Sequence, residues 1–200
     1  GIKMNGAQSI VRNCVIRNSS GGMTFENNDS VEVSNSLALG IKDVMPSIYT
    51  SSGAFYTLRS DEVLLNNLIL SNNTAGIKIK DYCEAQVRNS YFVLNNYGIE
   101  SYASLSAIEN NVLERNIMYD IRVCGDEFDS IIQKNYLLSD KGICIGLDIG
   151  FNYYDCTPII HDNNFQNHDV AMHIIGFNRF DVDASMNYFY TLDAEMIKAM

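Results

Sequence analysis

Apolar and polar residues alternate along this chain in many short runs. One kind of run often opens with glycine and then places an apolar residue at every second position, as in Gly1–Met4, Gly76–Ile79, Gly98–Ser101 and Gly142–Ile145. Alternation with a period of two is typical of β-strands, whereas a helix needs apolar spacings of three and four. The pattern therefore predicts an all-β chain of short strands. Only Leu192–Met200 has a helical pattern, so we expect a short helical C-terminal tail there.

The alternation is organised into a repeat that is marked by asparagine. The marking residues recur at intervals of 21–31 positions and are Asn13, Asn35, Asn66, Asn89, Asn110, Asn135, Asn163 and Asn187. A large apolar residue stands two positions after each of them, namely Val15, Leu37, Leu68, Tyr91, Val112, Leu137, Phe165 and Phe189. Two positions before the first five stand Val11, Val33, Leu64, Val87 and Ile108. Each unit is thus predicted to hold strands that an inward-facing asparagine interrupts at a fixed place.

Units of this length with short strands predict a parallel β-helix, in which each unit forms one coil. Equivalent residues of neighbouring coils would stack about 4.8 Å apart. The inward asparagines would form a ladder of side-chain amides that satisfies donors and acceptors inside the bend. Leucine-rich repeats have similar lengths, but their leucine consensus is absent here. We expect a single domain over residues 1–200 with about eight coils, right-handed by the crossover rule.

Composition and charge narrow the classes of function. Hydrophobic residues make up 46% of the 200 residues, which is enough for a core, and the formal net charge is −10. Nucleic acid binding needs clustered Lys and Arg, so an acidic chain argues against it. The sequence also has no run of about 20 apolar residues, so we expect no membrane-spanning helix.

The Asn-x-apolar and Gly-Ile-x-Ile elements resemble those of right-handed parallel β-helix repeats, in the pectate-lyase-like group of carbohydrate-active and surface proteins. The ending Asn187–Asp193 is similar to the NWWGT-x-D close common in bacterial members, with Tyr-Phe-Tyr in place of Trp-Trp-Gly. The resemblance implies a polysaccharide or glycan partner, a cleft along an outer strand face, and a secreted or cell-surface location. The polygalacturonase motifs and the Asp-Pro-His-Asp motif of the alginate epimerases are absent. The resemblance therefore leaves open whether the chain is an enzyme.

The start of the chain bears on domain organisation and partners. Gly1–Met4 already has the pattern of a coil strand, and no capping helix precedes it. An open β-helix end exposes unpaired strand edges. We expect a piece of a longer protein, or self-association end to end or face to face; a third reading takes Met4 as the natural start.

Aligning the first strands places their outward residues in one column. The column is predicted to run Lys3, Thr24, Tyr56, Lys78, Glu100, Arg122, Cys144 and His173, with Lys80 and Tyr102 beside it. Lys78, Glu100 and Arg122 would then be neighbours about 5 Å apart. The two cations would suit the carboxylates of an acidic sugar, and a cation with a lowered pKa would suit β-elimination. The alternative is a solvated face whose alternating charges avoid repulsion.

Two units overrun the mean length, and both are predicted to leave the coil as loops. These are Gly40–Ser52 and Gly146–Thr157. The second contains Asp148, Tyr153 and Tyr154, and aromatic rings beside carboxylates suit sugar rings. The alternative is a loop that packs its tyrosines on the coil face. The predicted ligand-binding set is Lys78, Lys80, Glu100, Tyr102, Arg122, Asp148, Tyr153 and Tyr154.

The five cysteines contain no C-x-x-C pair. We expect buried free thiols that act as small apolar residues. The alternative is a disulfide of Cys144 with Cys124 or Cys156 across neighbouring coils.

Metal binding is the last candidate chemistry. His161, His168 and His173 cluster in sequence beside Asp162 and Asp169, but His161 stands at a position where other units carry an inward Val or Ile. A core or ladder histidine is therefore expected rather than a metal ligand. The acidic turn formed by Asp126, Glu127 and Asp129 would bind calcium weakly or be a solvated turn. We expect no cofactor, with calcium as the only candidate.

Three functions follow in order of preference. The first is a carbohydrate-recognition module of a secreted or cell-surface protein, favoured by the outer column and the tyrosine-rich loop. The second is a structural or adhesive rod without catalysis, favoured by the missing catalytic motifs. The third is a polysaccharide lyase or epimerase that uses Arg122 or Lys78, with Glu100 in the same candidate group.

Overall fold

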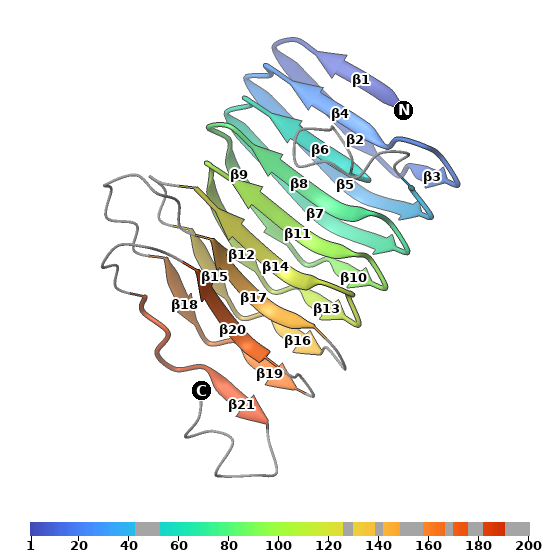
Figure 1. Ribbon diagram of the computed structural model, residues 1–200. Helices are drawn as coiled ribbons and strands as arrows, with labels where there is room; N and C mark the ends of the chain where they lie inside the picture. Colours follow the sequence, from blue (N-terminus) through green and yellow to red (C-terminus); the bar gives the residue numbers. More distant parts are fainter. Residues whose placement is uncertain are drawn as a thin grey trace.

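The computed structural model describes residues 1–42, 53–125, 130–138, 142–148, 158–166, 170–175 and 182–190. Every element in these ranges is a β-strand, and all of the paired strands run parallel. Strands of successive turns lie side by side from β1 near the N-terminus to β21 near the C-terminus (Figure 1). The described residues thus form an all-β parallel coil, as the period-two alternation predicts.

One face of the coil is an eight-stranded sheet. Its strands in spatial order are β1 (Ile2–Asn5), β4 (Met23–Glu26), β6 (Phe55–Leu58), β8 (Ala75–Lys80), β11 (Tyr97–Tyr102), β14 (Tyr119–Cys124), β17 (Ile143–Asp148) and β20 (Val170–Ile175). Neighbours in this sheet are separated in the sequence by strands of the other sheet, so the chain crosses between the two sheets in every turn.

The other sheet has thirteen strands and bends along its length. They are β2 (Gln8–Arg12), β3 (Val15–Arg17), β5 (Ser30–Leu39), β7 (Glu62–Ser71), β9 (Glu84–Arg88), β10 (Tyr91–Val93), β12 (Leu105–Glu109), β13 (Val112–Glu114), β15 (Ile131–Gln133), β16 (Tyr136–Leu138), β18 (Ile159–His161), β19 (Asn164–Gln166) and β21 (Tyr188–Tyr190). Strands β5 and β7 pass through the bend without a break, whereas the other turns use two short strands there.

The bend depends on a residue with left-handed backbone. Asparagine takes this role in five turns, with φ between 50° and 55° at Asn13, Asn35, Asn67, Asn89 and Asn110. Asparagine tolerates this conformation better than other residues that carry a Cβ. The side chains of these five residues are exposed, so these residues cannot form the inward-facing ladder.

From the turn of Asn111 onward, the residue that follows the left-handed position forms an amide ladder. Asn111 donates from Nδ2 to Asn135 Oδ1 at 3.0 Å, and Asn135 donates to Asn163 in the same way. Asn163 donates to Asn187 at 3.1 Å. The predicted ladder is therefore correct at Asn135, Asn163 and Asn187.

The predicted ladder positions of the earlier turns are wrong, because the inward residue is the one that follows the left-handed asparagine. The marked asparagine is itself left-handed in four of these turns, whereas in the third turn Asn67 takes that role and Leu68 is the buried residue. The wrongly predicted ladder positions are Asn13, Asn35, Asn66, Asn89 and Asn110. The buried apolar positions after the bend are shifted by one residue in the same way. Val15 is 58% exposed, whereas Phe92 and Leu113, which follow the predicted Tyr91 and Val112, are fully buried. Before the bend, Val11, Val33, Val87 and Ile108 are buried as predicted, and Leu65 replaces Leu64.

A second amide ladder lies inside the coil next to the eight-stranded sheet. Asn73 donates from Nδ2 to Asn95 Oδ1, and Asn95 donates to Asn116, each at 3.0 Å. The last amide, Asn116, donates to Asp120 Oδ1 at 2.7 Å. This ladder was not predicted, since its asparagines fall outside the main repeat.

Several predictions fall wholly or partly outside the described residues. The helical tail Leu192–Met200 lies outside them, as do residues 43–52 and 149–157 of the two predicted loops. The second loop was predicted to begin at Gly146, which is wrong, because β17 continues to Asp148.

Candidate functional site

The outer face of the eight-stranded sheet carries the predicted column. Strand register aligns Lys3, Thr24, Tyr56, Lys78, Glu100, Arg122, Gly146 and His173. The prediction of Cys144 in this column is wrong. Ile145 is the partner of Ile121, so β17 is shifted by two residues from the predicted alignment, and Cys144 is fully buried.

Three charged residues of the column, Lys78, Glu100 and Arg122, form an ionic chain that continues to Asp148. Lys78 Nζ lies 3.8 Å from Glu100 Oε2, and Arg122 Nη1 lies 3.6 Å from Glu100 Oε1. Arg122 also donates from Nε to Asp148 Oδ2 at 2.7 Å. Only 4% of the Lys78 side chain and 5% of the Glu100 side chain are exposed. The alternative of a solvated face is therefore wrong, and two cations are balanced by two carboxylates.

Tyr102 joins the members of this ionic chain. Its hydroxyl donates to Glu100 Oε1 at 2.8 Å and accepts from Arg122 Nη1 at 3.2 Å. Lys78 Nζ lies 5.3 Å from the centre of the Tyr102 ring, within the range of a cation–π contact. Burial, followed by the negative charge of Glu100, raises the pKa of Tyr102 above its ordinary value. Lys80, the strand neighbour of Tyr102, is half-buried at the end of β8.

Two tyrosines beside the ionic chain were missed by the sequence analysis. Tyr97 and Tyr119 are strand partners whose rings stack with centroids 6.1 Å apart and planes 9° apart. The guanidinium of Arg122 lies 5.5 Å from the Tyr119 ring centre. Both tyrosines precede the aligned isoleucines Ile99 and Ile121 by two positions, and that recurrence was the available signal.

Gly146 makes room for one of these rings. A Cβ atom placed on Gly146 would lie 2.3 Å from Cε1 of Tyr119. Gly146 occupies the column position next to Arg122, and the absence of a side chain there leaves space for the Tyr119 ring. The accessible part of the site is therefore Tyr97, Tyr119, Arg122 and Asp148, all of them half-buried, while Lys78 and Glu100 lie below it.

Electrostatics keep Arg122 in its charged form. Burial alone would lower the pKa of Arg122, but the hydrogen bond to Asp148 and the negative charge of Asp148 act the other way, and the pKa lies above its ordinary value. Burial raises the pKa of Cys124 to about 12, so this thiol is neutral near pH 7. Cys124 donates to Asp148 Oδ2 at 3.5 Å.

Other predicted groups do not join this site. Tyr153 and Tyr154 of the ligand-binding set lie outside the described residues, as does the acidic turn at 126–129. The four described cysteines, Cys14, Cys83, Cys124 and Cys144, are free thiols, so a Cys124–Cys144 disulfide is wrong; Cys156 lies outside the described ranges.

The histidines do not form a cluster where they are described. His161 is the strand partner of Gln133, and its Nδ1 lies 2.8 Å from Asp162 Oδ2. The inward residue of this strand is Ile160, so the prediction of His161 as a core or ladder residue is wrong. His173 is exposed on β20 of the eight-stranded sheet, and His168 lies outside the described residues. Within the described ranges, no three His, Cys, Asp or Glu side chains are grouped so that they could hold a metal ion.

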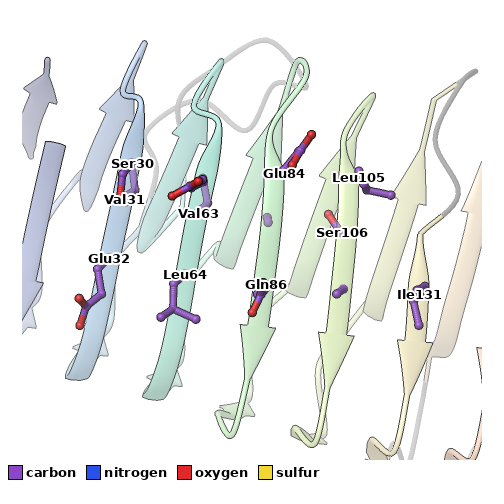
Figure 2. Close-up of a pocket in the computed structure, with 13 residues that line it drawn as sticks. Ser30, Val31, Glu32, Val63, Leu64, Glu84, Gln86, Leu105, Ser106 and Ile131 are labelled. Atoms are coloured by element: carbon purple, nitrogen blue, oxygen red, sulfur yellow. The ribbon is translucent and has the colours of Figure 1, made fainter. Parts of the chain in front are cut away.

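A groove on the thirteen-stranded sheet is a second candidate surface, which the sequence analysis did not find. It has a volume of about 560 Å³ and crosses β5, β7, β9, β12 and β15. Figure 2 shows Glu32, Leu64 and Gln86 side by side on three neighbouring strands and Ile131 two strands further along, with Glu84 and Leu105 at the opposite edge. The groove contains carboxylates, a carboxamide and aliphatic side chains, but no aromatic ring.

Comparison with known proteins agrees with this architecture. Among the described residues, we find no helix with the length and apolar character needed to cross a membrane. No curated protein and no solved structure gives a significant match to the chain. A family model described as a right handed beta helix region matches residues 1–113 and 47–188. These matches and the parallel strands confirm the predicted right-handed parallel β-helix, and the chain belongs to the right-handed beta helix region family.

Proposed function

We propose that this β-helix is a carbohydrate-recognition module that binds neutral sugar residues on the outer face of its eight-stranded sheet. The observation that carries the proposal is the stacked Tyr97–Tyr119 pair next to the accessible Arg122–Asp148 ion pair. A secreted or cell-surface location, where polysaccharides are found, is part of the same proposal.

The chemistry of the accessible edge suits a sugar. An aromatic ring that is partly exposed on a surface, as Tyr97 and Tyr119 are, offers contact to the apolar face of a pyranose. Asp148 and Arg122 offer an acceptor and several donors for vicinal hydroxyls within reach of the Tyr119 ring. The buried Lys78–Glu100 pair would hold Arg122 in position from below, since Glu100 contacts both cations.

Charge balance favours a neutral sugar over the acidic sugar considered from the sequence. Arg122 already bonds to Asp148, and Lys78 already faces Glu100. A uronate carboxylate would have to displace one of these carboxylates, whereas hydroxyl groups would add to them.

The two alternatives receive different support. A lyase that uses Arg122 as its base is disfavoured, because the raised pKa of Arg122 keeps it protonated. A structural rod is supported by the two amide ladders and the buried ionic chain. A binding measurement separates this rod from the proposed module.

The test is calorimetric titration with neutral and uronate oligosaccharides, using the wild type, Tyr119→Ala and Tyr188→Ala. Tyr188 is a matched control, because it is 60% exposed on the other sheet. We expect the wild type and Tyr188→Ala to bind neutral sugars equally, and Tyr119→Ala to bind about tenfold more weakly. The proposal would be rejected if the wild type showed no binding of neutral sugars at millimolar concentrations, or if Tyr119→Ala bound them as tightly as the wild type.

A further inference from the structure

The groove of the thirteen-stranded sheet is polarised along the coil axis. Its first row of outward side chains is Ser30, Glu62, Glu84 and Leu105, which are successive strand partners. Its second row is Glu32, Leu64, Gln86, Ala107 and Ile131. All three carboxylates thus lie on β5, β7 and β9, whereas the side of the groove formed by β12 and β15 is mostly aliphatic (Figure 2).

The carboxylates of the groove are not all neutralised. Glu32 accepts a hydrogen bond from Arg12 Nε at 2.8 Å. Glu62 and Glu84 are direct strand partners with exposed side chains, and neither makes an ion pair with any described residue. No basic residue lines the groove. Arg12 and Arg88 lie in the next row, at the register of Ser34 and Asn66. The acidic half of the groove therefore attracts positive charge.

We propose that this groove binds an extended segment of a partner protein, with basic side chains over β7 and β9 and apolar side chains over β12 and β15. Five strands spaced about 4.8 Å apart span about 19 Å, the length of roughly six extended residues. Basic side chains would complement Glu62 and Glu84, and aliphatic side chains would cover Leu105 and Ile131. A second copy of this chain would bring its own net charge of −10 to an acidic surface, which disfavours it.

The test uses blocked synthetic peptides with the full chain. One peptide carries lysines in one half and leucines in the other, and its matched partner has glutamates in place of the lysines. We expect the lysine–leucine peptide to bind and the glutamate peptide not to bind. Glu62→Gln/Glu84→Gln should weaken binding about tenfold and reduce its salt dependence. Leu105→Gln/Ile131→Gln should also weaken it.

Two controls keep the test specific. Glu109→Gln/Glu114→Gln removes the same charge from the same sheet outside the groove, and should leave binding unchanged. Equal weakening by this control, or no binding by the wild type at millimolar concentrations, would overturn the proposal. A photoreactive leucine in the apolar half should label residues 105–107 and 131, and labelling only elsewhere would also overturn it. Self-association that Glu62→Gln/Glu84→Gln abolishes would assign the groove to a second copy instead.

Discussion

The bend of each turn has two adjacent positions with different physical roles, and asparagine suits both of them. The first adopts a left-handed backbone, as Asn110 does with φ of 54°. The second faces inward and continues the amide ladder, as Asn111 does at 3.0 Å from Asn135. Sequence spacing could reveal the repeat, because both roles recur once per turn. Spacing could not tell whether a given asparagine is the left-handed residue or the inward-facing one, since asparagine suits both roles.

This division of roles predicts unequal effects of two neighbouring substitutions. Asn111→Ala would leave the buried backbone N–H of Ser90 without its acceptor and break the ladder, which should cost about 2–3 kcal/mol of unfolding free energy. Asn110→Ala should cost about 1 kcal/mol, because alanine tolerates the left-handed backbone poorly. Urea unfolding measures both values, and an equal or larger loss for Asn110→Ala would contradict the ladder assignment.

Asp120 is a buried carboxyl group whose surroundings differ strongly from water. It is fully buried, its Oδ1 accepts from Asn116, and its Oδ2 has no partner among the described residues. Burial raises the pKa of Asp120 to about 7. Between the ordinary pKa of 3.8 and about 7, the folded chain therefore binds a proton that the unfolded chain has released.

Stability should consequently fall as pH rises through this range. The loss between pH 5 and pH 8 should approach about 3 kcal/mol, because one pKa unit corresponds to about 1.4 kcal/mol. Asp120→Asn is isosteric with the protonated acid and should remove this component. Urea unfolding of both chains at pH 5 and pH 8 measures it. The same pH dependence in Asp120→Asn and wild type would show that another group is responsible.

At the scale of elements, four neighbouring strands are joined by buried charges. Lys78 of β8, Glu100 of β11, Arg122 of β14 and Asp148 of β17 alternate in sign across the sheet. The sequence could place the first three as neighbours, because their strands share one repeat register. It could not show their burial, since burial depends on the packing of the whole face.

Breaking one link of this chain should be costly. Glu100→Gln would remove the carboxylate that Lys78 and Arg122 share, while Asp148 would still pair with Arg122, and should cost about 3 kcal/mol of unfolding free energy. In Lys78→Met/Glu100→Gln the loss should be smaller than the sum of the two single losses, because the unpaired cation is removed. A double-mutant cycle by urea unfolding measures the coupling. Strict additivity would argue against a buried ion pair between β8 and β11.

Gly146 of β17 offers a way to move Tyr119 without removing it. In Gly146→Ala the new methyl group would overlap the Tyr119 ring, and the flexible ring should move rather than the backbone. We expect the fold to persist by circular dichroism and the affinity for neutral sugars to fall about tenfold, as expected for Tyr119→Ala. Wild-type affinity in Gly146→Ala would show that the position of this ring does not matter for binding.

At the scale of the whole molecule, the repeat predicts the architecture well and the sites less well. Eight aligned strands on one face follow from units that each place a short alternating strand, often opened by glycine, before an asparagine-marked bend. The stacked tyrosines Tyr97 and Tyr119, the gap at Gly146 and the groove over β5–β15 depend on contacts between turns. Contacts of this kind do not appear in the pattern of any single unit.

Sugar binding on the eight-stranded sheet can be tested by mapping backbone amide shifts during titration with a neutral oligosaccharide. A uniformly ¹⁵N-labelled chain would report which face of the β-helix the sugar occupies. If the sugar binds beside the stacked tyrosines, the shifts should concentrate in β11, β14 and β17, around Tyr97, Tyr119, Arg122 and Asp148, and the groove residues Glu62 and Glu84 should be unchanged. Shifts confined to the thirteen-stranded sheet, or no shifts at millimolar sugar, would contradict this binding site.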